Sequence, residues 1–139
     1  MRGVCLHCGE PLGPRYRALD FRRALRHGKV WTVLASDVYP RCCSKACWEA
    51  YWPRWAGQLG LTCVFPDTAA DSAPCGFCGA AVLLSAPHLS VCAVDLEELP
   101  PFDEGVGRVH SDRTLAVICA ACDDSQETAA VRARRMERV

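Results

Sequence analysis

Apolar and polar residues follow each other along the chain in patterns that predict several short helices and strands. Residues 17–28 (RALDFRRALRHG) contain good helix formers and end on a glycine, which accepts the left-handed conformation found after helix C-termini, so we expect a helix there. Residues 29–35 (KVWTVLA) are rich in β-branched and aromatic side chains and predict a strand. The first half should therefore contain a basic helix followed by a strand.

The second half shows strand patterns that lead into a helical pattern. Strands are predicted over AAVLLS (80–85), LSVCAVDL (89–96) and TLAVIC (114–119). Residues 98–107 (ELPPFDEGVG) predict a loop because they combine prolines, glycines and acidic residues. Residues 125–139 predict a closing helix.

Aromatic residues between positions 48 and 55 have helical spacing. The positions i, i+3, i+4 and i+7 place four of them on one face: Trp48, Tyr51, Trp52 and Trp55. Ser44 is expected to cap this helix, and Pro53 to kink or restart it. One interpretation is that the stripe packs in the core. The other is that it forms a partly exposed anchor for a partner, because Trp and Tyr dominate interface hot spots.

The cysteine content indicates how so small a chain is stabilised. A chain of 139 residues forms one ordinary domain or two very small ones, and very small domains bury too little apolar surface to fold unaided. Its 11 cysteines offer either a disulfide framework or metal sites.

Because MRGVCLHCGE has no apolar run typical of a signal peptide, we expect reduced thiols and a cytoplasmic location. No stretch reaches the roughly 18 apolar residues of a membrane helix, so no membrane partner is expected.

Eight cysteines form two sets in the same order. CLHCGEPLG (5–13) and CGFCGAAVL (75–83) each contain Cys-x-x-Cys-Gly, and a second cysteine pair follows each at a distance. In such a turn two thiolates point to one side and can bind the same ion, while the glycine relieves the left-handed backbone position. The predicted ligands are Cys5, Cys8, Cys43 and Cys47 for one site, and Cys75, Cys78, Cys119 and Cys122 for the other.

Zinc is the metal that this pattern favours. Four thiolates around tetrahedral zinc form a closed structural site, so the sequence predicts two structural Zn²⁺ ions without an open position for water. Disulfides and iron–sulfur clusters are the alternatives, although widely separated ligand pairs favour zinc. The three remaining cysteines, Cys42, Cys63 and Cys92, lie in apolar surroundings and are expected to be packing thiols.

These patterns predict a small, zinc-stabilised α+β fold with two tandem units. Residues 1–65 would form a basic zinc-binding unit, and residues 75–139 a second zinc-binding unit with a C-terminal helix. Residues 66–74 (PDTAADSAP) lack large apolar side chains and predict a linker between them. Zinc would supply the folding free energy that a large core supplies elsewhere.

Charge is unevenly distributed although the net charge is zero. Residues 1–58 carry 10 basic and 4 acidic side chains, whereas residues 59–139 carry 6 and 12. The basic half could contact nucleic acid, or its charges could form a solvated face. The candidate contact residues are Arg15, Arg17, Arg22, Arg23 and Arg26. The acidic segment 95–105 suits contact with a basic protein or with the positive half of the chain itself.

The run Cys43-Ser-Lys-Ala-Cys47, preceded by Cys5-Leu-His-Cys8-Gly and followed by Trp48 and Tyr51, resembles treble-clef zinc fingers that end in Cys-Ser-x-x-Cys. This pattern occurs in MYND, TRASH and FCS-type fingers and in the small bacterial gyrase-inhibitor zinc proteins. The resemblance covers residues 5–52 and implies a knuckle, a β-hairpin and a helix that starts at the second pair. It departs from those families in its long gap of 34 residues and in Cys42, where an aromatic is usual.

The second half, residues 75–138, is more loosely similar to zinc-ribbon and HNH nuclease treble clefs. In an HNH enzyme a histidine on the hairpin acts as the base, and His110 is the only candidate here. The usual neighbouring acid and the later histidine or asparagine are absent, because Asp123, Asp124 and Ser125 follow the last cysteine pair. We therefore treat an HNH-like nuclease, active or degenerate, as the least favoured alternative.

The sequence thus favours a non-enzymatic, zinc-binding adaptor or regulator that docks on a protein partner, within a nucleic-acid-handling machine for example. No catalytic triad, phosphate-binding glycine loop or convergent carboxylate pair supports an enzyme, and no small-molecule substrate is evident. Direct DNA or RNA binding through the basic N-terminal unit is the main alternative.

Overall fold

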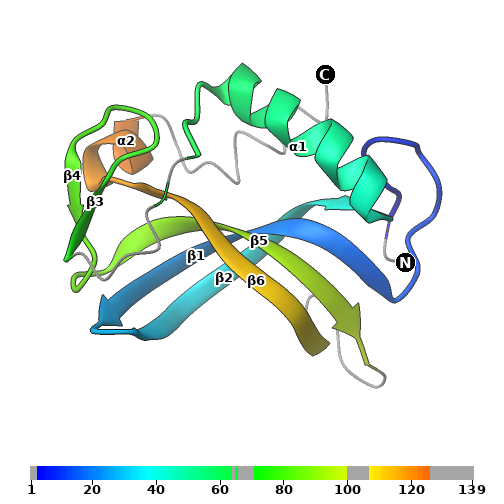
Figure 1. Cartoon of the computed structure of the whole chain (residues 1–139), viewed down its shortest axis with the longest axis horizontal. Helices are drawn as coiled ribbons and strands as arrows, with labels where there is room; N and C mark the ends of the chain where they lie inside the picture. The colour runs from blue at the N-terminus through cyan, green and yellow to red at the C-terminus, as the bar shows by residue number, and fades with distance from the viewer. Residues whose placement is uncertain (1–2, 64, 66–70, 100–106, 126–139) are drawn as a thin grey trace.

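The computed structural model describes residues 3–63, 65, 71–99 and 107–125, which form a mostly β structure with one long and one short helix (Figure 1). The elements are β1 (Arg15–His27), β2 (Val30–Cys42), α1 (Lys45–Leu59), β3 (Ser72–Pro74), β4 (Ala81–Leu83), β5 (His88–Glu98), β6 (Gly107–Ile118) and α2 (Ala120–Ser125). The four long strands make one sheet, and β3 and β4 form a separate two-stranded hairpin.

The long strands are ordered β2-β1-β5-β6, and every neighbouring pair is antiparallel. The central pair runs from Arg15 opposite Glu97 to Ala24 opposite His88. Because β1 belongs to the N-terminal half and β5 to the C-terminal half, strands from both sides of segment 66–74 share this sheet.

The helix predicted over residues 17–28 is wrong, since this segment lies within β1. β1 is a central strand whose backbone pairs with β2 on one side and β5 on the other. Its alternate residues are buried on both faces: Leu19 and Phe21 on one, Tyr16 and Ala18 on the other. The helix propensity of arginine, leucine and alanine is a weak preference, and burial between two layers overrides it.

Gly28 has the left-handed conformation that the sequence indicated, with φ of 63°, but in a different setting. It lies in the tight turn between β1 and β2, where His27 pairs with Val30. The strand predicted over residues 29–35 is confirmed within β2, and those predicted in the second half are found in β4, β5 and β6.

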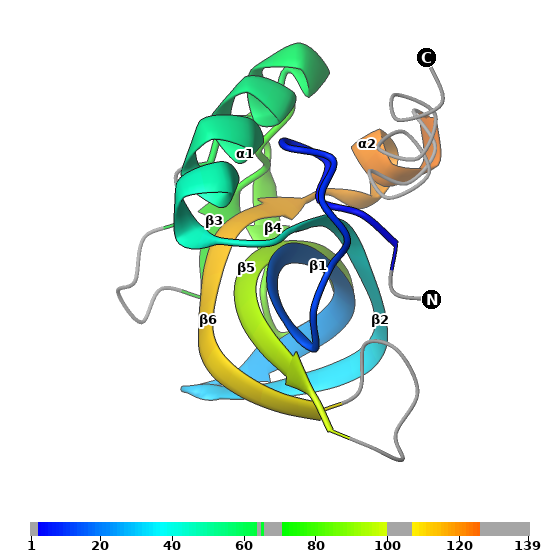
Figure 2. The same ribbon diagram turned by 90° about the vertical axis from the view of Figure 1, so that its right-hand side faces the viewer.

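The two halves repeat one arrangement. In each half, a cysteine turn precedes an antiparallel pair of long strands, which leads into a second cysteine pair beside a helix. The strand pairing skips Leu34 in β2 and His110 in β6, and these bulged residues are 76 positions apart, as are Cys43 and Cys119. Because bulges increase the local twist of a strand, both edges contribute to the strong curl of the sheet (Figure 2).

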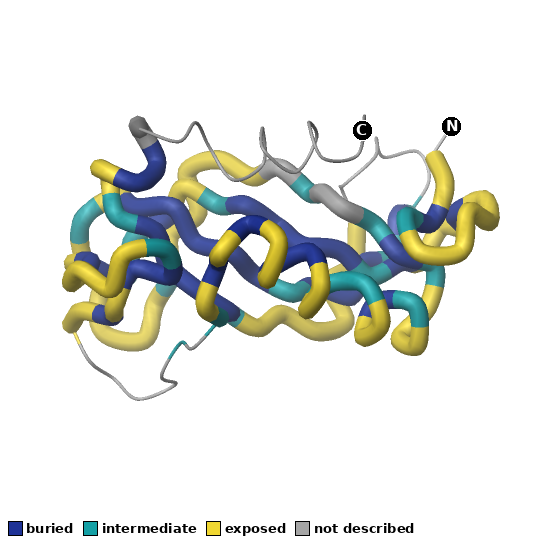
Figure 3. Tube along the Cα trace, turned by 90° about the horizontal axis from the view of Figure 1, so that it is seen from above, coloured by how far each residue is buried: buried dark blue, intermediate teal, exposed yellow. Residues whose placement is uncertain are grey.

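The helix α1 starts where the sequence predicted, and it covers one face of the sheet. Ser44 caps it by accepting a hydrogen bond from the Cys47 N–H, and the helix continues through Pro53 to the left-handed Gly60. Buried residues gather along the central strands and on the inward side of α1, which includes Trp55 (Figure 3).

The chain after α1 is fixed to the second cysteine turn. The Thr62 N–H donates to the Gly76 carbonyl at 2.8 Å, and the Gly76 N–H donates to the Val117 carbonyl at 2.9 Å. A Cβ atom on Gly76 would lie 2.6 Å from Leu61 Cδ1 and 2.9 Å from the Thr62 carbonyl oxygen. Only glycine therefore allows this close approach between the segment after α1 and the β3–β4 turn.

Three other sequence predictions are only partly covered by the described residues. Residues 72–74 of the predicted linker are a strand, β3, so the linker prediction is wrong there because this segment pairs with β4. Residues 66–70 of the linker, residues 100–106 of the predicted loop and residues 126–139 of the predicted closing helix lie outside the described residues.

Candidate metal centres

The first cysteine cluster lies where β1 begins and β2 ends. Cys5 and Cys8 lie in a turn in which the Cys5 N–H donates to the Glu10 carbonyl and the Gly9 N–H donates to the Cys5 carbonyl. Cys43 follows β2, and Cys47 lies in the first turn of α1. The cluster therefore joins an N-terminal turn, a strand end and a helix start.

The second cluster has the same construction at the other end of the sheet. The turn between β3 and β4 contains Cys75 and Cys78, closed by bonds from the Cys75 N–H to the Ala80 carbonyl and from the Gly79 N–H to the Cys75 carbonyl. Cys119 follows β6, and Cys122 lies in α2. Because β1 and β5 are antiparallel, the two clusters lie at opposite ends of the sheet (Figure 1).

The sulfur positions of both clusters fit a tetrahedral ion. All four sulfurs of each group lie within 4.8 Å of one another, and each group could hold one metal ion. The Cys8 and Cys43 sulfurs are 3.6 Å apart, those of Cys43 and Cys47 are 3.8 Å apart, and those of Cys78 and Cys119 are 3.6 Å apart. Metal–sulfur bonds of about 2.3 Å in a tetrahedron imply sulfur separations of about 3.8 Å. A disulfide would need about 2.05 Å.

Backbone amides favour a thiolate at the first cysteine of each turn. Burial raises the pKa of Cys5, but nearby N–H groups, first that of Cys8, lower it by more, to about 6. The pKa of Cys75 is also brought to about 6, because the N–H groups of Cys119 and Phe77, each 3.4 Å from its sulfur, outweigh burial. One ligand of each cluster is thus prepared to carry negative charge.

The remaining thiols would be stabilised as thiolates by a bound cation. The shared hydrogen bond with Cys8, followed by burial, raises the pKa of Cys43 to about 12. Burial, and then its contacts with Cys119 and Cys78, also raises the pKa of Cys122. Four thiolates this close repel each other, and a divalent ion at the centre would remove that cost. The chemistry of the donor set therefore fits a metal site.

The other cysteines and histidines lie outside both clusters. Cys42 and Cys92 are buried, as predicted, and Cys63 is half-buried and packs against the core. Burial raises the pKa of both Cys63 and Cys92 to about 11, which keeps them as neutral thiols at pH 7. His7 is exposed.

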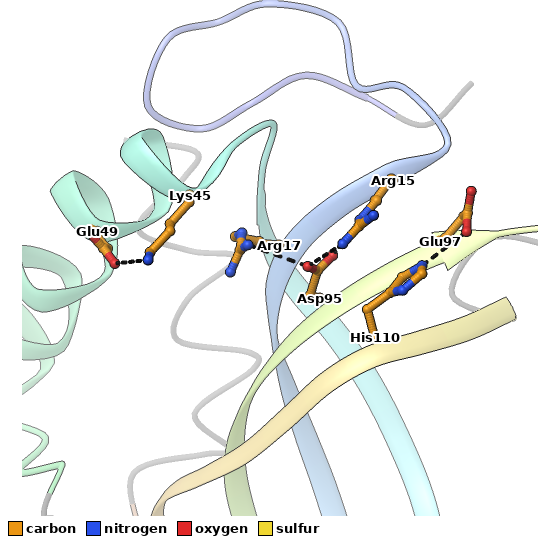
Figure 4. Close-up of polar contacts among 7 residues, drawn as sticks. All are labelled: Arg15, Arg17, Lys45, Glu49, Asp95, Glu97 and His110. Atoms are coloured by element: carbon orange, nitrogen blue, oxygen red, sulfur yellow. Dashed lines mark hydrogen bonds and ion pairs between the residues drawn. The ribbon is translucent and has the colours of Figure 1, made fainter.

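His110 does not approach the second cluster. It lies near the start of β6, whereas Cys119 follows the end of that strand, nine residues or about 30 Å further along the chain at about 3.3 Å per residue. Its Nε2 lies 3.0 Å from Glu97 Oε1 on β5 (Figure 4). Within the described residues, the groups that an HNH nuclease needs are not brought together.

Two of the five candidate arginines, Arg15 and Arg17, pair with the same acid from the other half of the chain. Arg15 donates to both carboxylate oxygens of Asp95, at 3.1 and 3.0 Å, and Arg17 lies 3.4 Å from the same carboxylate (Figure 4). The hydrogen bond from Arg15 and the charge of Arg17 hold the pKa of Asp95 below its usual range. Asp95, Glu97 and Glu98 lie in β5, so the start of the predicted acidic loop is a strand.

The other candidate arginines also have partners. Arg22 is held by Asp20 at 2.6 Å and by Asp112 at 2.7 Å, and Arg23 pairs with Asp123. The Arg26 guanidinium lies 5.6 Å from the centre of the Trp31 ring. The sequence could not identify these acids as partners, because their approach depends on which strands are neighbours.

The aromatic stripe divides between the core and the surface. Trp48 and Trp55 are buried, whereas Tyr51 and Trp52 are half-buried and pack against the core. Trp48 and Trp52 stack with their ring centroids 6.3 Å apart. Packing thus explains most of the stripe, with Tyr51 and Trp52 partly open to solvent.

In the part of the chain that the structure describes, no helix combines the length and apolar character needed to cross a bilayer.

Comparisons with models of known protein families, with curated proteins and with solved structures found no match to this chain.

Proposed function

We propose that each cluster binds one structural Zn²⁺ and that the halves are two treble-clef-like units. Cys5, Cys8, Cys43 and Cys47 would hold one ion, and Cys75, Cys78, Cys119 and Cys122 the other. Four thiolates fill the coordination sphere of tetrahedral zinc, which leaves no position for a reacting water. Each ion would bind the cysteine turn, the strand end and the helix at its own end of the sheet. The order of cysteine turn, strand pair and helix supports the treble-clef assignment.

On this basis the chain acts as a non-catalytic docking protein, and its partner is a protein. The observation that carries this proposal is the exposure of large apolar side chains on one edge strand, β2: Val30 is 68% and Leu34 56% exposed. Exposed apolar side chains on an unpaired edge strand are typical of protein interaction sites. The arginines that a nucleic acid would need are instead engaged with Asp95, Asp20, Asp112, Asp123 and Trp31.

Affinity capture from a nuclease-treated lysate of the native host tests this function. The zinc-loaded wild type should retain a stoichiometric protein partner, and a Val30→Lys, Leu34→Lys variant should retain at least about tenfold less of it, because two lysines would disrupt an apolar contact. Val109→Lys is the matched control, since Val109 is a 50% exposed valine on the opposite edge strand, β6.

Equal retention by the wild type and the double-lysine variant would exclude β2 as the docking edge. Recovery of no protein over several salt concentrations would contradict the adaptor function. Recovery of nucleic acid before nuclease treatment, with steep loss as salt rises, would favour the alternative of direct nucleic-acid binding.

A further inference from the structure

The face of the sheet opposite α1 contains two adjoining cavities. Phe21 contacts α1 through Trp55, so the neighbouring Arg22 and Ala24 of β1 point to the other face. The inner cavity, of about 330 Å³, is lined from all four long strands by Arg22, Ala24, Trp31, Val33, Ser90, Cys92, Asp112 and Thr114. The outer cavity, of about 630 Å³, is lined by Arg26, Gly28, Lys29, Trp31, Phe65, Asp112, Arg113 and Thr114. We call the two together the sheet groove; they share Trp31, Asp112 and Thr114.

The floor of the inner cavity contains a polar group without a partner. Ser90 is 1% exposed, and its hydroxyl makes no hydrogen bond among the described residues. Leaving a buried hydroxyl unpaired costs free energy, so such a group indicates a place where a ligand or water completes the bonding. Cys92 and Thr114, whose sulfur and oxygen are 3.8 Å apart, provide further polar atoms beside it.

The wall of the groove can hold a planar ring. Trp31 is half-buried between the two cavities, with Val33 beside it in the inner cavity and Phe65 in the outer one. The Trp31 and Phe65 ring centroids are 6.3 Å apart and the rings are tilted by 52°, so they do not stack on each other. The Arg26 guanidinium lies 5.6 Å from the centre of the Trp31 ring, and the His88 ring centroid lies 5.7 Å from it. Aromatic side chains of this kind bind the flat faces of heterocycles.

The mouth of the groove is positively charged. Arg26, Lys29 and Arg113 line the outer cavity with one acid, Asp112. Asp112 is already paired with Arg22 of the inner cavity at 2.7 Å, so it does not neutralise the outer cations. An anionic group is therefore favoured at the mouth.

We propose that the sheet groove binds a nucleotide, with the base in the inner cavity and the phosphate in the outer one. The base stacks on Trp31 and bonds the Ser90 hydroxyl through its polar edge, and the phosphate contacts Lys29 and Arg113. Small-ligand sites usually occupy about 300–1,000 Å³, and the volumes of the inner and outer cavities, about 330 and 630 Å³, lie in this range. The same chemistry suits a free nucleotide or one residue of a single strand. This site goes beyond the docking function and lies on the other face from α1.

Calorimetric titration of the zinc-loaded full chain tests this site. The titrants are AMP, GMP, CMP and UMP, the four matching nucleosides, and a single-stranded octanucleotide. Saturable binding of at least one nucleotide, weakened by about tenfold or more when the phosphate is absent, is expected. Binding of a mononucleotide indicates a free ligand, and binding of the octanucleotide alone indicates a single strand; both support the site.

The double variant Lys29→Glu, Arg113→Glu should lower the affinity by at least about tenfold, and raised salt should also lower the affinity of the wild type by at least about tenfold.

Ser90→Ala separates binding from folding. Removing an unpaired buried hydroxyl should leave the melting temperature unchanged or raised, while the affinity for the preferred nucleotide falls about fivefold or more. Arg54→Glu, an exposed charge reversal on α1, should bind as the wild type does. The proposal is overturned if neither the mononucleotides nor the octanucleotide binds at millimolar concentration. It is equally overturned if binding is unaffected by both the Lys29, Arg113 double variant and Ser90→Ala.

Discussion

The indole of Trp55 on α1 packs edge-on against the ring of Phe21 on β1, with the ring centroids 5.9 Å apart and the ring planes at 61°. Both side chains are almost fully buried, so this pair is a main contact between the helix and the sheet. Edge-to-face aromatic pairs add to the free energy of burying the two side chains. The orientation of α1, and with it the position of Cys47 in its first turn, depends on this contact.

Trp55→Ala should lower the free energy of unfolding by about 3–5 kcal/mol, because it leaves a cavity against Phe21. Denaturant unfolding of the zinc-loaded protein, followed by far-ultraviolet circular dichroism, measures the change. Trp52→Ala is the matched control on the same helix: Trp52 is only half-buried, and its loss should cost about 1 kcal/mol. Equal effects of the two substitutions would mean that Trp55 does not anchor α1.

The separation of the two clusters leads to a prediction about metal content. The wild type should contain two zinc ions per chain, and Cys43→Ser and Cys119→Ser should each contain one, because each removes a ligand from a different end of the sheet. Native mass spectrometry counts the ions. Hydrogen exchange should show increased exchange near the altered cluster only.

Cys63→Ser is the control for these two variants, since Cys63 lies outside both clusters, and it should retain two ions. Loss of both ions from either ligand variant would show that the sites do not form independently. Fewer than about two zinc ions in the wild type would contradict the two-site assignment.

How much of this structure the sequence could predict depends on whether the information is local. The Cys-x-x-Cys-Gly turns and the Ser44 cap are set by a few neighbouring residues, and the ligand sets follow from the chemistry of thiolates. The strand β1 is different, because its arginines and leucines favour a helix locally and become a strand only through pairing with β5, over 60 residues away. The sheet groove could not be predicted for the same reason. Trp31 on β2 and Ser90 on β5 line one cavity only because of how the strands pair and the sheet curls.

Arg22 is buried between two carboxylates and should therefore contribute strongly to stability. Its side chain is 15% exposed, and it binds Asp20, which is 8% exposed, and Asp112. Arg22→Ala would leave the Asp20 charge buried with the Ser36 hydroxyl as its remaining partner. We expect a loss of about 3 kcal/mol in denaturant unfolding, within the range for removing one member of a buried ion pair.

Arg54→Ala serves as the reference for this prediction, because Arg54 is exposed on α1 and its loss should change stability by less than about 0.5 kcal/mol. A similarly small effect of Arg22→Ala would show that Arg22 is free at the surface and available to a partner. The large expected effect also means that a loss of nucleic-acid binding in an Arg22 variant has to be checked against its folding.

His88 should make stability depend on pH in a defined window. Burial lowers its pKa below the ordinary 6.5, and the nearby Arg26 lowers it further, although the Ala86 carbonyl bonded to Nδ1 opposes both. As the pH falls below about 6.5, the unfolded chain gains a proton at His88 that the folded chain does not take up, so the free energy of unfolding decreases. Above that pH this contribution is fully present.

The wild type should therefore lose stability as the pH falls below about 6.5 more steeply than His88→Gln, whose side chain does not titrate. Denaturant midpoints at quarter-unit pH steps measure the two slopes, with zinc content checked at each step because protonation of thiolates also releases metal. Parallel slopes for the wild type and His88→Gln would mean that His88 takes up its proton equally in the folded and unfolded chains.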